Sequence, residues 1–179
     1  MKKSFTLFLI FILFSCGSNN RIIENYLLEE MKKNEKENNI LIKEKISFEN
    51  SMLCFMPLTT KPHSIEKLKL YEDLNKKYGG KLQENWREKD FKKINFNIIP
   101  EDSLSNYKKN NELKFSISNL YFISKPFFYK GNKDRFVFFN INLCKNSYRC
   151  TGDNFYGIIL KKVKGKWIFV EKRPTSNLY

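Results

Sequence analysis

The chain has 179 residues, 41% of them hydrophobic and 16% aromatic, which is typical of one folded domain and excludes a largely disordered chain. Its formal net charge of +14 would suit a nucleic-acid partner, but only five of the 33 basic residues are arginine, the better ligand for phosphate. Lys, Asn, Phe and Ile, which share A/T-rich codons, make up 83 residues, so codon bias accounts for the excess lysine and we expect no nucleic acid as partner.

Residues 1–15 have the pattern of a secretory signal. A cationic start at Lys2 and Lys3 precedes an apolar run over residues 5–14, and a serine then stands directly before Cys16. The run is shorter than the ~20 apolar residues that cross a bilayer. We therefore expect a signal that is cleaved before Cys16.

The four residues that end at Cys16, Leu-Phe-Ser-Cys, resemble the cleavage site of bacterial lipoproteins. The resemblance implies that Cys16 is acylated on its sulfur and its amine, and that it holds the protein to a membrane outside the cytosol. Residues 16–20 then read as the lipidated cysteine and a short tether. Since no Asp follows the cysteine, the resemblance favours the periplasmic face of the outer membrane.

Three cysteines follow Cys16. Cys144 and Cys150 have five residues between them and are the natural disulfide pair in an oxidising envelope. Closing so short a loop should contribute about 2 kcal/mol in the chain-entropy model. Cys54 stands in an apolar run, which predicts a buried thiol.

Residues 21–179 are expected to form a single domain whose first half is mainly helical. Amphipathic spacing predicts a helix over residues 21–33, and alternation predicts a strand over 40–48. Ser64 is a candidate N-cap for a second helix, which the glycine pair at 79–80 ends. Further predicted elements are a helical turn or two between residues 82 and 90, a short strand over 94–99, and a polar segment with a single helical turn over 101–111.

From Leu113 onward the pattern predicts an antiparallel meander. Alternation continues to Ile123, and Pro126 predicts a bulge or an edge position. A strand follows at residues 127–130, then the clearest strand at 135–144, then a hairpin of 154–163 and 166–172 that turns at Lys164-Gly165. Helices precede the sheet, so we expect an α+β fold with N-terminal helices on one face of a curved antiparallel sheet formed mainly by the C-terminal half.

Two elements of the C-terminal half carry a resemblance to other proteins. They are the Ser-Lys-Pro sequence at 124–126 and the hairpin sequence from Tyr156 to Trp167, which contains Lys-Lys-Val-Lys-Gly-Lys-Trp. In this respect the chain resembles small uncharacterised lipoproteins of Bacteroidetes-type bacteria. The resemblance implies an envelope lipoprotein and supplies no activity and no catalytic residue.

Chemical motifs are scarce in the remainder of the chain. His63, the single histidine, has no Gly-x-Ser-x-Gly elbow beside it, and a capping or exposed role suits it better than catalysis. A zinc site of Cys54, His63, Cys144 and Cys150 lacks the paired ligand spacing of structural zinc. We expect no catalytic residue, no metal and no cofactor.

The densest basic cluster lies on the last hairpin. Two interpretations remain open: a solvated tip that also blunts edge pairing, or a contact surface for an acidic envelope protein or an anionic lipid or glycan. Its residues are Lys161, Lys162, Lys164, Lys166, Lys172 and Arg173.

Three functions follow as hypotheses. The first is a monomeric, lipid-anchored envelope protein that acts as a non-catalytic binding or interaction module. The second is a lipoprotein that gives immunity to, or inhibits, an envelope-targeted toxin. The third is an envelope hydrolase with a cryptic site, which a deep pocket gathering His63 with two carboxylates would favour.

Overall fold

The computed structural model describes residues 19–31, 38–55, 65–116, 118–131, 133–145 and 155–174. Within these ranges, five helices and a seven-stranded sheet form an α+β fold, which confirms the predicted class. The helices are α2 (Asn19–Met31), α3 (Phe48–Phe55), α4 (Ile65–Tyr78), α5 (Leu104–Asn110) and α6 (Glu112–Ser116). The strands are β1 (Asn38–Ile42), β2 (Asn97–Ile99), β3 (Ser118–Ile123), β4 (Phe127–Lys130), β5 (Arg135–Cys144), β6 (Phe155–Val163) and β7 (Lys166–Pro174).

The sheet is mixed: the C-terminal strands pair antiparallel as predicted, and two parallel pairs, which the sequence pattern did not predict, extend it. Its order is β2-β1-β3-β5-β6-β7, with β4 paired to β5, and β1 runs parallel to both β2 and β3. The remaining pairs are antiparallel. Parallel neighbours need long connections, and the chain supplies one because α3, α4, β2, α5 and α6 all lie between β1 and β3.

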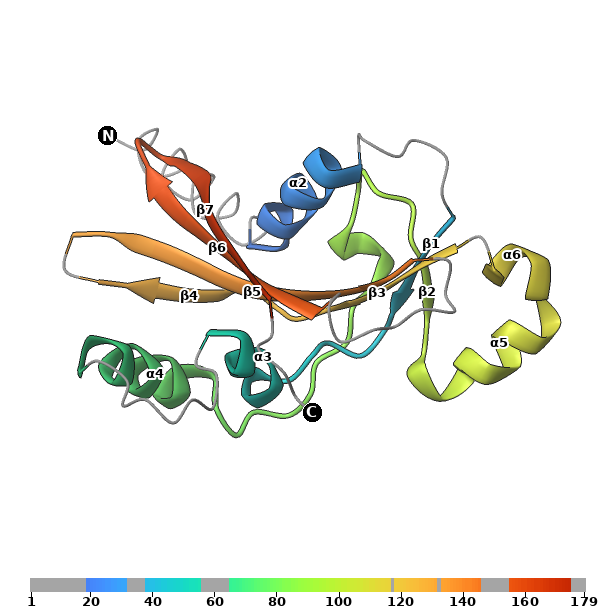
Figure 1. Ribbon diagram of the computed structural model, residues 1–179, viewed down its shortest axis with the longest axis horizontal. Helices are drawn as coiled ribbons and strands as arrows, with labels where there is room; N and C mark the ends of the chain where they lie inside the picture. The colour runs from blue at the N-terminus through green and yellow to red at the C-terminus, as the bar shows by residue number, and fades with distance from the viewer. Residues whose placement is uncertain are drawn as a thin grey trace, which may run out of the picture.

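Helices cover both faces of the sheet, whereas the sequence pattern predicted one (Figure 1). Helix α2 packs on one face, where Val137, Phe139 and Ile141 of β5 are fully buried. Helices α3 and α4 pack on the other face, against Phe138 of the same strand. Strand β5 thus carries apolar side chains on both faces of the sheet, and helices bury each face.

The interruption predicted at Pro126 is confirmed. Strands β3 and β4 pair with successive parts of the same edge of β5, and Ser124 lies between them. The Ser124 amide donates to the carbonyl oxygen of Asn140 (3.1 Å), and the Asn140 amide donates to Ser124 Oγ (2.9 Å). The serine hydroxyl therefore takes the place of a backbone acceptor where the proline breaks the strand.

The terminal hairpin also forms as predicted, with its turn at Lys164 and Gly165. Both residues have positive φ, 48° and 82°, as a two-residue turn of type I′ requires. Register shifts between Ile159 and Leu160, which leaves Val170 of β7 as a bulge. The bulge adds one residue to β7. The alternation of side chains between the two faces of the sheet is therefore shifted by one residue after Val170.

Other local predictions need correction. Helix α2 begins at Asn19, so the last two residues of the predicted tether are helical. The strand expected over residues 40–48 ends at Ile42 and continues only as single bridges, because Ser47 starts α3: its hydroxyl accepts from the amide of Asn50 (3.2 Å). Residues 82–90 contain an isolated bridge and the 3₁₀ turn Glu88–Asp90 rather than regular helix.

Residues 101–116 are more helical than predicted, since the sequence pattern indicated a single helical turn over 101–111 and a strand from Leu113 onward. The 3₁₀ turn Glu101–Ser103, α5 and α6 follow one another there. Leu113 and Phe115, assigned to the meander by alternation, lie in α6 instead, where Phe115 is buried against Ile40 and Leu120. A buried contact with the sheet therefore overrides the alternating pattern.

An ion cluster of Lys45, Glu84 and Lys125 ties the 82–90 segment to the sheet. Glu84 Oε2 lies 3.0 Å from Nζ of Lys45, and Glu84 Oε1 accepts from Lys125. Burial alone would raise the pKa of the Glu84 carboxyl, but hydrogen bonds from the two lysines outweigh it and lower the pKa below its ordinary value. Lys45 is itself buried, and Glu84 supplies the opposite charge beside it.

We expect Glu84→Gln to destabilise the protein in a pH-dependent way. A depressed carboxyl pKa contributes stability above the unfolded pKa, near 4.5, and loses it as the pH falls through the folded pKa. The melting temperature of Glu84→Gln should therefore lie below that of the wild type at pH 7, and the gap should narrow at pH 3. Glu88→Gln, an exposed change of equal charge, should show no such gap; an equal gap for both variants would contradict the interpretation.

Candidate functional site

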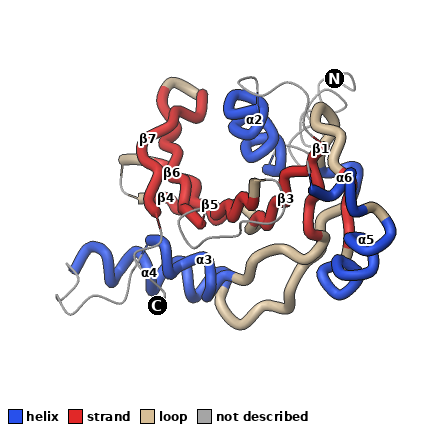
Figure 2. Tube along the Cα trace, turned by 45° about the vertical axis from the view of Figure 1, so that its right-hand side comes forward, coloured by secondary structure: helices blue, strands red, loops and turns tan. Residues whose placement is uncertain are grey.

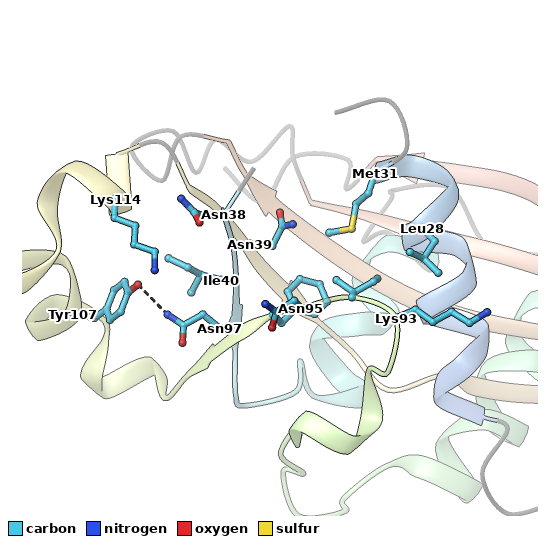
Figure 3. A pocket seen from close by; sticks show the side chains of 12 residues that line it. Leu28, Met31, Asn38, Asn39, Ile40, Lys93, Asn95, Asn97, Tyr107 and Lys114 are labelled. Carbon is cyan, nitrogen blue, oxygen red and sulfur yellow. Dashed lines mark hydrogen bonds between the residues drawn. The ribbon is translucent and has the colours of Figure 1, made fainter. Parts of the chain in front are cut away.

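Two hollows flank helix α2, and neither is lined by a described carboxylate. The first, which we call the asparagine cleft, has a volume of about 510 Å³ and lies between the C-terminal end of α2, the starts of β1 and β2, and helices α5 and α6 (Figure 3). The second, the cationic pocket, has a volume of about 640 Å³ and lies between the N-terminal part of α2 and strands β4 to β7. Both volumes are in the range of small-molecule sites.

Amide side chains dominate the polar lining of the asparagine cleft. Asn97 Nδ2 donates to the hydroxyl of Tyr107 (2.9 Å), which bridges β2 to α5 across the cleft (Figure 3). Apolar wall is supplied by Leu28 and Met31 of α2. The four asparagines are Asn38, Asn39, Asn95 and Asn97, and the two cations are Lys93 and Lys114.

Asn39 carries an unsatisfied acceptor in this cleft. Its Oδ1 is inaccessible to solvent and accepts no hydrogen bond within the part of the chain that the structure describes. An amide oxygen left in that state destabilises the fold by about 1–3 kcal/mol.

The cationic pocket joins positive side chains to aromatic ones. Phe128 and Trp167 lie edge to face with ring centroids 6.0 Å apart, and Lys162 Nζ stands 5.7 Å from the Trp167 ring. Helix α2 contributes Arg21, Ile22 and Asn25. The further cations in the lining are Lys77, Lys130 and Arg135.

The structure places the six basic residues of the last hairpin in different settings. Lys161 pairs with Asp134 (2.9 Å), and Arg173 pairs with Glu171 (2.7 Å). Lys172 Nζ lies 3.7 Å above the Tyr156 ring. Lys164 and Lys166 are exposed at the hairpin turn, and Lys162 alone of the six enters the cationic pocket.

The remaining predicted residues fall in separate places. Cys54 is buried between α3 and the sheet, and Cys144 is buried in another hydrophobic cluster at the end of β5. Cys16, His63 and Cys150 lie outside the described residues. Acylation of the first and the Cys144–Cys150 disulfide therefore stay predictions.

Groups with clearly shifted pKa values lie away from both hollows. Burial, with a smaller effect of Glu30, raises the pKa of Tyr156 to about 12, and burial likewise raises that of Tyr26. Backbone hydrogen bonds at Glu49 and Gly80 lower the pKa of the Glu49 carboxyl. Each shift has a local structural cause, and none marks a general acid or base beside a hollow.

Sequence reasoning missed Arg21, Lys130 and Arg135. Two signals were present. Arginine is rare in this chain, and the predicted strands 127–130 and 135–144 follow each other closely, which makes Lys130 and Arg135 neighbours when the strands pair. The asparagine cleft left no comparable signal, because its members are spread over residues 28–114 and come from several elements.

Searches over the described ranges returned neither a group of three or more His, Cys, Asp or Glu side chains placed to hold a metal, nor a helix long and apolar enough to cross a membrane. Comparisons with known proteins found no matching family, no matching curated protein and no matching solved structure.

Proposed function

We propose that this protein is a lipid-anchored binding module of the bacterial envelope, and that the asparagine cleft holds its ligand. The anchor is inferred from the signal-like sequence that ends at Cys16. The binding role is supported by one observation above all: four asparagines and a tyrosine gather around a hollow of about 510 Å³.

The lining favours a ligand rich in hydroxyl and amide groups. Asparagine both donates and accepts, so it suits partners that do the same. Leu28 and Met31 offer an apolar wall for the less polar face of such a molecule, and Lys93 and Lys114 would accommodate a carboxylate. Glycan fragments of the cell wall combine these groups, and they are present where the anchor would hold the protein.

Titration of the full chain in detergent with the N-acetylglucosamine–N-acetylmuramic acid disaccharide tests the proposed site. We expect saturable binding that Asn95→Ala and Asn97→Ala weaken about tenfold, since each removes a hydrogen-bonding amide. Asn106→Ala, an exposed asparagine of α5 outside the cleft, is the matched control and should bind as the wild type does. Absence of binding, or equal loss in the control, would count against the cleft.

The anchor has its own readout in the same preparation. Labelled palmitate should enter the wild-type chain and not Cys16→Ser. A wild-type product that takes up no label would refute the anchor while leaving the binding result intact.

A further inference from the structure

We infer that the cationic pocket is a second binding site, for a phosphate-type anion that carries an apolar or aromatic group. This inference is independent of the asparagine cleft, which lies at the opposite end of α2. It rests on cations that strands β4, β5 and β6 and helices α2 and α4 bring together, with aromatic rings beside them.

Like charges are placed side by side across the strands. Lys130 of β4 lies directly opposite Arg135 of β5. On the next strand, β6, Lys161 lies opposite Phe136 of β5. The same antiparallel register, continued by one residue, places Lys162 opposite Arg135. Like charges opposite one another destabilise a sheet, and an anion bound between them would relieve the repulsion.

These cations lack acidic partners within the described part of the chain. The ion pairs found there use other basic residues, and the pocket has no carboxylate in its lining. Helix α2 lies on the face of the sheet opposite α3 and α4 (Figure 2), and its Arg21 adds a guanidinium to the lining. The pocket thus gathers five positive side chains, of which only Lys77 donates to a backbone carbonyl, that of Phe128 (3.3 Å).

The arginines of the cationic pocket indicate that its positive charge does not follow from the codon bias that raises the lysine content of the chain. The A/T bias that accounts for lysine does not account for arginine, and the chain has only five arginines. Two of them, Arg21 and Arg135, line this one pocket. Their planar guanidinium groups suit a phosphate because each can donate two parallel hydrogen bonds.

The aromatic members define the other half of the ligand. Trp167 and Phe128 form a wall beside the cations, and Ile22 of α2 extends it. A bare inorganic anion would leave this wall unused, whereas a phosphate ester with an apolar body would contact both parts. Phospholipid headgroups and soluble aromatic phosphates share this chemistry.

The test uses the full chain reconstituted into phosphatidylcholine vesicles, with phenyl phosphate as probe. We expect saturable binding with quenching of tryptophan fluorescence, because Trp167 lines the pocket. The variant Arg135→Gln/Lys162→Gln should lose at least about tenfold in affinity. The matched control Lys164→Gln/Lys166→Gln makes the same change in net charge at the turn of the β6–β7 hairpin, outside the pocket, and should keep the wild-type affinity.

A second arm identifies the source of the anion. If vesicles containing about one fifth phosphatidylglycerol weaken phenyl phosphate binding, a lipid headgroup occupies the pocket; if they do not, a soluble ester is the ligand. Either result supports the site. No binding of phenyl phosphate, or an equal loss in both double variants, would overturn it, and neither result bears on the disaccharide titration at the asparagine cleft.

Discussion

Trp86→Ala should lower the free energy of unfolding by about 3–5 kcal/mol, the range for large aromatic residues in a packed core. Trp86 is 1% exposed, and its ring centroid lies 5.0 Å from that of Phe91. Its Nε1 donates to the carbonyl oxygen of Ile123 (3.0 Å), and Lys45 Nζ lies 4.3 Å from the ring. Alanine would therefore leave a cavity and a buried lysine without its aromatic neighbour, and it would remove one of the two hydrogen bonds that the Ile123 carbonyl accepts.

The measurement is urea unfolding followed by far-ultraviolet circular dichroism, which does not depend on the lost tryptophan. Leu82→Ala is the control, because Leu82 stands four residues earlier in the same segment and is 93% exposed; its effect should stay within about 0.5 kcal/mol. Trp86→Phe should fall between the two, since it keeps most of the volume and loses the hydrogen bond. Equal midpoints for Trp86→Ala and Leu82→Ala would show that the segment does not hold the sheet.

Gly157→Ala should destabilise the protein by about 1–3 kcal/mol through overpacking. A Cβ at this position of β6 would lie 2.6 Å from Cε1 of Phe55 and 3.0 Å from Cβ of Cys54. Helix α3 thus rests directly on the strand backbone, and its own side chains prevent any substituent there. Gly157 also faces Asn140 across the strands.

Gly131→Ala is the matched control for this variant. Its Cβ would meet Tyr129 at an ordinary 3.4 Å, and Gly131 lacks a positive φ. The control should be neutral or slightly stabilising, because alanine reduces the entropy of the unfolded chain. Adding Phe55→Leu should recover part of the loss in Gly157→Ala, and thermal melts of the four proteins give the coupling. Strict additivity would contradict the contact.

The elements that the sequence predicted well depend on contacts close along the chain. The helix that ends at Tyr78, the strand Arg135–Cys144 and the turn at Lys164-Gly165 each follow from local spacing, breakers or φ preference. The α+β class required no more than the order of such elements.

Pairing between strands that are far apart in the chain determined the features that local sequence patterns did not predict. The parallel placement of β1 between β2 and β3 is set by burial of Ile40, Leu41 and Ile42, whose partners are remote in the chain. The same register sends Lys161 and Arg173 to carboxylates and brings Lys162 beside Arg135 under α2. Side-chain types along a strand are written in the sequence, but which of them meet depends on the alignment of strands and helices that the whole core selects.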